Sequence, residues 1–141
     1  MKVSDILANK DSRIYSVTGQ SSVYDALQLM SEKNIGALII MDGGRLAGIL
    51  SERDYARKIV LKGRSSHDTL VKEIMTENVV TVTPEDPIEK CMELMSSKRF
   101  RHLPVVEDTK VIGMIAIGDV LNAIIETQKE TIEQLHQYIS Q

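Results

Sequence analysis

The chain lacks several features that would place it in a class of protein at once. It has 141 residues but one cysteine, Cys91, so neither a disulfide framework nor a multi-cysteine zinc site is expected. Lys and Arg number 17 against 20 Asp and Glu, and this balance argues against a nucleic-acid partner. The longest apolar stretches, 36–41 and 111–117, are too short to cross a bilayer. The first ten residues carry no signal-peptide pattern, so we expect a cytoplasmic protein without a membrane contact.

The usual signatures of catalysis are also missing from the sequence. There is no Ser-His-Asp or Cys-His arrangement, no Walker-type phosphate loop and no Gly-x-Gly-x-x-Gly motif. The three histidines, His67, His102 and His136, have no metal-ligand spacing. Cys91 falls on the apolar face of an expected helix and is interpreted as a buried, inert thiol. We therefore expect a protein that is not an enzyme and requires no metal.

What the sequence does contain is a duplication. Residues Ser16 to Val60 align without a gap on Thr81 to Ile125, and Gly48 and Asp54 meet Gly113 and Asp119. Upstream, residues 3–7 match residues 71–75. The repeats therefore divide the chain into residues 1–62, a polar linker 63–70, residues 71–125 and a C-terminal helical extension 126–141.

Each repeat predicts the same order of elements, β-α-β-β-α. Short extended segments at 15–18 and 79–83 precede helices that open at Ser22, a capping residue, and at Pro87, a residue favoured in the first helical position. Apolar strands then flank the turns Asp42-Gly43-Gly44 and Asp108-Thr109, which predicts two β-hairpins. Helices follow at 52–61 and from Gly118 onward. The fold class expected is α+β, with the two repeats packed face to face in pseudo-two-fold symmetry.

The turn from strand to helix at Ser51 to Asp54 is the strongest candidate for a binding site. Unpaired N–H groups at a helix start favour an anion, Arg53 can pair with phosphate, and Asp54 can accept hydrogen bonds from a ribose diol. The competing interpretation is a plain helix cap, since Ser-x-x-Asp is a capping pattern. In the second repeat Ala116 replaces the serine while Asp119 remains, and an aspartate kept without its capping partner favours a ligand. Arg57 and Lys58 are interpreted mainly as a solvated helix face.

These residues resemble the CBS domain, named for cystathionine β-synthase, and a tandem pair of them resembles a Bateman module. The resemblance rests on 48–54 and 113–119, on the Arg-His-Leu-Pro run 101–104, and on Glu73-Ile-Met-Thr76. It extends over nearly all of residues 1–125 and is similar in pattern to small stand-alone bacterial proteins with two CBS domains.

The resemblance implies two nucleotide clefts, each shared by residues of both repeats. The first comprises Ser51, Arg53, Asp54, Thr81, Val82, Thr83, Arg101, His102 and Pro104. The second, expected to bind more weakly, comprises Ser16, Val17, Thr18, Gly36, Ala37, Gly118 and Asp119. The usual ligands of the family are adenine nucleotides, of which AMP or NAD(H) is favoured here and ADP or ATP is an alternative.

The sequence therefore predicts a regulatory sensor that transmits nucleotide occupancy to a protein partner. The alternative is a constitutive interaction scaffold with vestigial pockets. Apolar residues 121, 125, 132, 135 and 139 follow a heptad-like spacing interrupted by Gln128, so the C-terminal helix needs a partner surface. Folding back on its own repeats would supply one, but a homodimer is the preferred interpretation.

Overall fold

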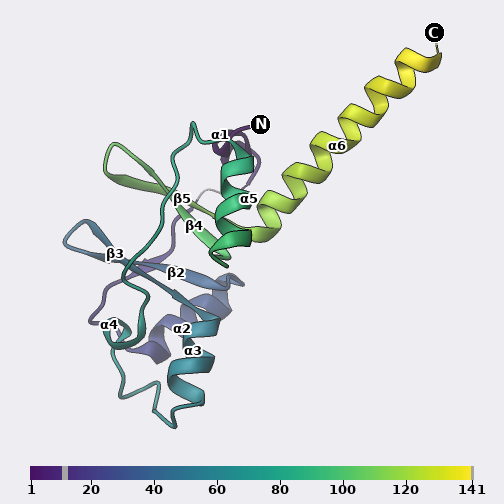
Figure 1. The fold of residues 1–141 in the computed structure, drawn as a ribbon. Coiled ribbons are helices and arrows are strands. Elements are labelled where there is room, and N and C mark those ends of the chain that lie inside the picture. The colour runs from purple at the N-terminus through teal and green to yellow at the C-terminus, as the bar shows by residue number, and fades with distance from the viewer. Residues whose placement is uncertain (11–12, 141) are drawn as a thin grey trace. The chain divides into compact units, whose positions relative to one another are not determined.

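The computed structural model describes residues 1–10 and 13–140, and these residues form two compact units (Figure 1). The first unit combines Met1–Arg13 with Thr81–Gln141, and the second is Ile14–Val80. Gln141, the last residue of the expected extension, lies outside the described residues. The units differ from the sequence repeats because each contains the short N-terminal helix of the other repeat. The repeat boundaries themselves stay a prediction from the sequence.

The unit Ile14–Val80 is built on a three-stranded sheet in the order β1-β2-β3. Strand β1 (Ser16–Val17) pairs in parallel with β2 (Ala37–Asp42), which pairs in antiparallel with β3 (Arg45–Ser51). Gly43 and Gly44 turn the hairpin with φ angles of 59° and 78°, as the glycine pair predicts. Helix α2 (Val23–Lys33) and helix α3 (Glu52–Tyr55) pack against this sheet, and α4 (Val71–Ile74) completes the unit (Figure 1).

Helix α2 begins where the sequence predicts. The hydroxyl oxygen of Ser22 accepts a hydrogen bond of 3.0 Å from the backbone N–H of Asp25, and Asn34 ends the helix in the left-handed conformation. Val23, Ala26 and Met30 lie on its buried face, at helical spacing. They form one core with Leu38, Ile40, Leu50, Ile59, Val71 and Ile74.

The predicted helix over 52–61 is only partly correct. The α-helical part ends at Tyr55, and Ala56–Val60 forms a π-helical segment in which the N–H of Leu61 bonds to the carbonyl of Ala56 at 3.1 Å. Its buried residue, Ile59, still packs into the core.

The other unit contains the hairpin of β4 (His102–Glu107) and β5 (Lys110–Ala116) together with α5 (Ile88–Ser97) and α6 (Ile117–Ser140). Pro87 occupies the N-cap position of α5 and is not its first helical residue, because its ψ of 153° is extended. The expected strand at 79–83 is reduced to one parallel bridge between Val82 and Val105. Cys91 is fully buried on α5, as predicted, and burial raises the pKa of its thiol.

Helix α1 (Val3–Ala8) docks on the second repeat in the way that α4 docks on the first. The N–H of Val3 donates to the carbonyl of Asp86 at 2.9 Å, and the N–H of Val71 donates to the carbonyl of Ser21 at 2.8 Å. Val3 and Val71 are both fully buried. The duplicated sequence therefore uses one docking geometry twice, with the helices exchanged.

Candidate functional site

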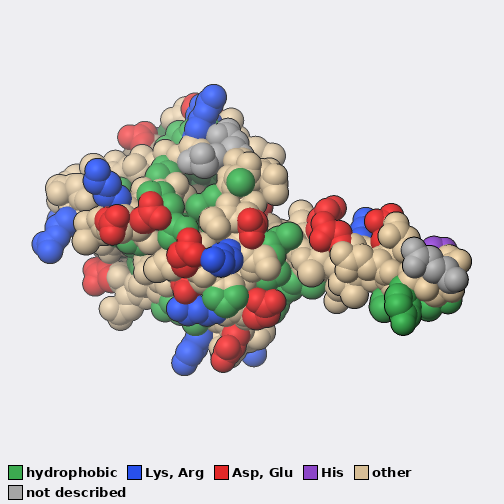
Figure 2. Space-filling view, turned by 90° about the horizontal axis from the view of Figure 1, so that it is seen from above, with side chains coloured by type: hydrophobic (Ala, Val, Ile, Leu, Met, Phe, Trp, Pro, Cys, Tyr) green, Lys and Arg blue, Asp and Glu red, His purple; other side chains and the backbone are tan. Residues whose placement is uncertain are grey.

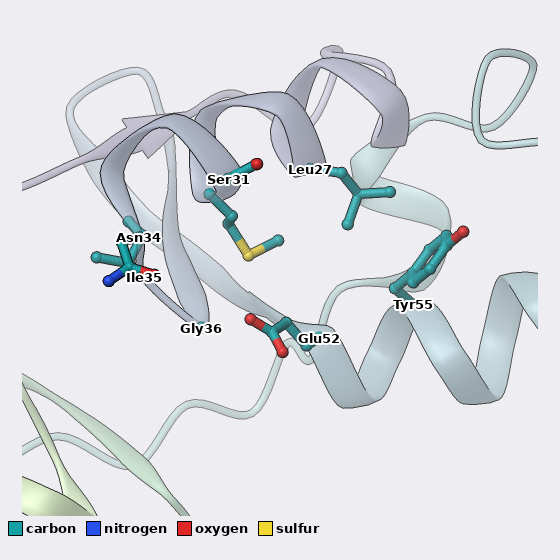
Figure 3. A pocket seen from close by; sticks show the side chains of 8 residues that line it. Leu27, Ser31, Asn34, Ile35, Gly36, Glu52 and Tyr55 are labelled. Carbon is teal, nitrogen blue, oxygen red and sulfur yellow. The ribbon is translucent and has the colours of Figure 1, made fainter.

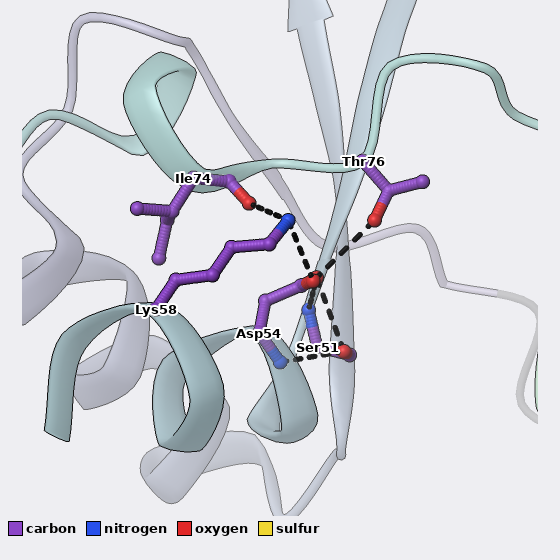
Figure 4. Close-up of polar contacts among 5 residues, drawn as sticks. All are labelled: Ser51, Asp54, Lys58, Ile74 and Thr76. Atoms are coloured by element: carbon purple, nitrogen blue, oxygen red, sulfur yellow. Dashed lines mark hydrogen bonds and ion pairs between the residues drawn. The ribbon is translucent and has the colours of Figure 1, made fainter. Parts of the chain in front are cut away.

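The strand-to-helix turn at the end of β3 is closed by a reciprocal pair of hydrogen bonds (Figure 4). The N–H of Asp54 donates to the hydroxyl oxygen of Ser51 at 3.2 Å, and the N–H of Ser51 donates to Oδ2 of Asp54 at 3.0 Å. The Ser51 hydroxyl also donates to Oδ2 at 3.1 Å. This arrangement is a capping box, so the helix-cap interpretation of Ser51 and Asp54 is confirmed.

The second oxygen of Asp54 is also occupied. The ammonium of Lys58 lies 3.2 Å from Oδ1, and the hydroxyl of Thr76 donates to the same atom at 3.4 Å (Figure 4). Lys58 donates in addition to the carbonyl of Ile74 at 2.8 Å. With a side chain only 12% exposed, Asp54 connects the start of α3 to the segment that follows α4. A ribose at Oδ1 would have to displace one of these two donors.

Lys58 was expected to lie on a solvated helix face, and its side chain is indeed 43% exposed, but its ammonium has partners that this interpretation did not include. Its spacing of four residues from Asp54 brings the two side chains onto the same side of the helix, where they form an ion pair. The spacing is visible in the sequence, so this partner of Asp54 was predictable. Thr76 carries no such local signal.

Asp119 repeats half of this arrangement in the other unit. Its Oδ2 atom accepts a hydrogen bond of 2.7 Å from the N–H of Ala116 and lies 2.8 Å from the ammonium of Lys10. Lys10 also donates to the carbonyl of Met114 at 2.9 Å. The argument that Asp119 without a serine partner favours a ligand is therefore wrong, because the carboxylate caps the turn by itself. Asp119 nevertheless remains more accessible than Asp54, with 26% of its side chain exposed.

Five of the predicted site residues come together at one end of the sheet in the unit Ile14–Val80. Ala37 pairs with Ser51 across the β2–β3 ladder, and the carbonyl of Gly36 accepts a hydrogen bond of 3.1 Å from the N–H of Glu52. Arg53 is exposed on the first turn of α3 beside the buried Asp54. The remaining three predicted residues of this unit, Ser16, Val17 and Thr18, lie in β1 or directly after it.

The other predicted residues form a matching group in the unit that contains Thr81–Gln141. His102 pairs with Ala116, and the carbonyl of Arg101 accepts a hydrogen bond of 2.9 Å from the N–H of Ile117. Val82 is buried between the exposed Thr81 and Thr83, and its N–H donates to the carbonyl of the buried Pro104 at 3.0 Å. Gly118 and Asp119 begin α6 beside this group. Each predicted cleft draws on both units, so its assembly stays a prediction.

A pocket that the sequence did not predict lies between α2 and α3 (Figure 3). It has a volume of about 580 Å³ and is lined by Leu27, Met30, Ser31, Asn34, Ile35, Gly36, Glu52 and Tyr55. Gly36 is the one predicted site residue in this lining. The carboxylate of Glu52 faces the pocket, so a phosphate group is disfavoured there (Figure 3).

The described parts of the chain contain neither a metal-binding cluster nor a membrane-spanning helix. Within residues 1–10 and 13–140, His, Cys, Asp and Glu side chains form no cluster able to hold a metal ion. Over the same ranges no helix combines the length and apolar character needed to cross a membrane.

Two folded copies of one sequence repeat, each with an aspartate that closes a strand-to-helix turn, define a duplicated α+β protein. The model of the CBS domain family matches residues 3–61 and 71–126. The chain therefore belongs to the CBS domain family and contains a pair of these domains, a regulatory type of module.

Known proteins of similar sequence and structure agree with this assignment. The mitochondrial CBS domain-containing protein CBSX3 of Arabidopsis thaliana is 42% identical, over 97% of this chain and 71% of its own length. A solved structure of a protein with CBS domains from Burkholderia ambifaria MC40-6 has a TM-score of 0.87 at 50% identity, covering 91% of this chain and 96% of its own. The CBS domain pair of protein MJ0100, solved with 5′-methylthioadenosine and S-adenosyl-L-methionine, has a TM-score of 0.79 at 26% identity, covering 90% and 98%.

Proposed function

We propose that this CBS pair is a non-enzymatic sensor that binds an adenine nucleotide, with AMP or NAD(H) favoured, and transmits its occupancy to a protein partner. The observation that carries the proposal is the adenosine-containing pair of ligands held by the MJ0100 domain pair, which is similar to this chain over 90% of its length. A cytoplasmic location and a homodimer are part of the same proposal. ADP and ATP remain alternative ligands.

The charges of the candidate residues support a ligand that carries phosphate. Arg53 and Arg101 are both exposed, and each adjoins the strand-to-helix turn of its own unit. A guanidinium can bind phosphate through two parallel hydrogen bonds. Because a helix start also favours negative charge, phosphate is the group that both features would attract.

The two aspartates differ in what they offer to a ribose. Asp119 has the more accessible carboxylate, whereas Asp54 already accepts hydrogen bonds or ion pairs from Ser51, Lys58 and Thr76. Binding at Asp54 would therefore exchange Lys58 or Thr76 for a ribose hydroxyl. Such an exchange would loosen the link between α3 and the segment after α4, and a ligand shifts a conformational equilibrium only through a difference of this kind.

The saturation of Asp54 also favours the second candidate function, a constitutive interaction scaffold. If the carboxylate serves only to fasten the turn, the pocket at that turn is vestigial. The scaffold then binds its partner equally with and without nucleotide. A thermal-shift panel separates the two functions, using AMP, ADP, ATP, NAD+, NADH, S-adenosylmethionine and 5′-methylthioadenosine at millimolar concentration.

A sensor is expected to melt several degrees higher with one ligand of this panel, because a ligand well above its Kd stabilises by about 2–4 kcal/mol. A flat panel contradicts the sensor and supports the scaffold. Arg53→Ala is expected to weaken AMP about tenfold, while 5′-methylthioadenosine, which has no phosphate, keeps its affinity. Arg45→Ala, an exposed arginine at the far end of β3, is the matched control and leaves both affinities unchanged.

Asparagine variants locate the ribose. Asp119→Asn and Asp54→Asn keep an oxygen that can accept the backbone N–H of the turn but remove the negative charge. The variant that loses affinity for both AMP and 5′-methylthioadenosine identifies the carboxylate that holds the diol. Unchanged affinity in both variants contradicts a role for either aspartate in ligand binding.

A further inference from the structure

Helix α6 presents two apolar faces, and only one of them packs against its own unit. Val120 and Ala123 are buried where α6 contacts α5 and α1. From Ile125 to Ser140 every residue is exposed, and the helix leads away from β4, β5 and α5 of the same unit (Figure 1). The exposed part has no partner among the described residues, although it continues the same unbroken helix.

The second face is an apolar stripe, defined here as Leu121, Ile125, Ile132, Leu135 and Ile139. These side chains are between 44% and 79% exposed. With 3.6 residues per turn, the stripe lies roughly 130° around the helix from the face that contains Val120 and Ala123. Figure 2 shows hydrophobic side chains gathered along one side of the far end of this helix. An apolar stripe of this length on a projecting helix marks an interaction surface.

We propose that the apolar stripe of α6 pairs with the same stripe of a second copy of this chain, as a parallel two-stranded coiled coil. Together with Gln128, the stripe residues alternate at steps of four and three, the spacing of a heptad seam. Isoleucine occupies the a positions 125, 132 and 139, and leucine occupies the d positions 121 and 135. In parallel coiled coils, β-branched residues at a with leucine at d favour two strands.

The charges of α6 favour a second copy over other occupants. The carboxylates of Glu126, Glu130 and Glu133 lie at the outer b and f positions, so two stripes can meet without opposing them. Residues 125–140 contain one Lys, Lys129, and no Arg. Because glutamates outnumber it, this part of α6 is not suited to bind an anionic lipid surface. Because α6 is continuous to Ser140, the stripe cannot fold back on its own unit without breaking the helix.

Gln128 and Lys129 select the parallel orientation. Gln128 occupies a d position, so a parallel pair places it beside Gln128 of the second copy, where the two amides can hydrogen-bond to each other. An antiparallel pair places each amide against isoleucine and leaves it without a partner, which is unfavourable. An antiparallel pair also brings e positions together, which places Lys129 near Lys129 of the other copy. One polar layer of this kind also fixes the register.

Disulfide trapping tests the orientation in the full-length chain. Ile139→Cys is expected to form a covalent dimer on mild oxidation, because parallel helices place position 139 beside itself. Gln137→Cys, on the outer face two residues away, is the matched control and is expected to stay at background. Cys91 does not compete, since it is fully buried with a raised thiol pKa. Crosslinking of Leu121→Cys to Ile139→Cys in a mixture, without Ile139 homodimers, reveals an antiparallel pair and overturns the proposal.

Sedimentation equilibrium tests whether the stripe holds the copies together. The double variant Ile132→Glu with Leu135→Glu is expected to raise the dissociation constant of the dimer at least about tenfold. Gln134→Glu with Gln137→Glu adds the same charge to the outer face of the same helix and is expected to change little. Equal dissociation constants for the two double variants, or a wild-type monomer in the micromolar range, overturn the proposal. Nucleotide affinity is a separate measurement, so pairing through the stripe and nucleotide binding can fail independently, whereas a wild-type monomer would also remove the homodimer from the proposed function.

Discussion

The ammonium of Lys10 lies 2.8 Å from Oδ2 of Asp119, although 109 residues separate them in the sequence. This ion pair joins the segment after α1 to the first turn of α6. In the other unit, the equivalent Asp54 is contacted by Thr76 and Lys58. The two units therefore hold equivalent carboxylates with donors that come from different parts of the sequence.

Replacing Lys10 by Met is expected to lower the free energy of unfolding by about 1 kcal/mol, because Asp119 and the carbonyl of Met114 both lose a donor. Urea unfolding measures the loss. Lys2→Met is the matched control, since the pair of Lys2 with Glu85 is exposed on both sides and is expected to contribute little to stability. Equal losses in the two variants contradict the role given to Lys10.

Gly48 and Gly113 are equivalent in the two repeats but are expected to respond differently to alanine. A Cβ atom at Gly48 would lie 2.7 Å from the backbone carbonyl oxygen of Thr76, whereas one at Gly113 would lie 2.9 Å from Cδ2 of Leu7. Backbone cannot move aside as a leucine methyl can, so Gly48→Ala is expected to cost about 1–3 kcal/mol and Gly113→Ala less. Urea unfolding of both variants checks the order, and a larger loss at Gly113 contradicts it.

The second hairpin turn contains a strained residue, Thr109, and replacing it by glycine is expected to relieve the backbone strain. Asp108 and Thr109 have φ angles of 49° and 68°, where the first hairpin has two glycines. A β-branched residue is rare in the left-handed region, so Thr109→Gly is expected to raise the free energy of unfolding by about 0.5–1 kcal/mol. The reciprocal variant, Gly44→Thr, is expected to lower it. Thermal unfolding of both variants provides the measurement, and a destabilised Thr109→Gly refutes the strain.

Asp86 makes stability depend on acidity. The backbone N–H of Thr83 bonds to its carboxylate at 2.8 Å, and with the nearby Lys90 ammonium it holds the pKa of Asp86 below the ordinary value of 3.8. A carboxylate with a lowered pKa stabilises the folded state above the unfolded pKa, and the contribution is lost as the pH falls through the folded pKa. Asp86→Asn is therefore expected to be less stable than the parent above pH 3.8, with the difference shrinking below it.

Urea unfolding midpoints of the parent and Asp86→Asn, measured from neutral pH to about pH 2.5, test this dependence. Lys90→Met is the companion variant. It is expected to retain most of the pH dependence, because the hydrogen bond from Thr83 is the largest cause of the lowered pKa. Parallel stability curves for the parent and Asp86→Asn contradict the assignment.

Local patterns in the sequence were sufficient for much of the fold. The glycine pair 43–44 and the cap at Ser22 act over a few residues, and both produced the element that they predict. Of the two partners of Asp54, one could be predicted from the sequence and the other could not. Lys58 follows from helical spacing, while Thr76 reaches Asp54 only through the pairing of Ile49 with Thr76.

The exchange of α1 and α4 was beyond the reach of the sequence pattern. Residues 3–7 and 71–75 resemble each other, so both predict the same kind of helix. Which repeat each helix joins depends on contacts such as Leu7 against Gly113 and Val71 with Ser21, and neither is marked in the spacing. For the same reason Lys10 could not be identified as the partner of Asp119.

The exchange of α1 has a consequence for synthesis on the ribosome. Residues 14–80 form a complete unit as soon as they have emerged, whereas Met1–Arg13 belong with Thr81–Gln141, which are translated later. Residues 1–13 leave the exit tunnel before residues 14–80 but can dock only after residues 81–141 have been translated. Vectorial folding usually proceeds from the amino terminus. Here residues 14–80 can fold while residues 1–13 stay undocked until residues 81–141 have been synthesised.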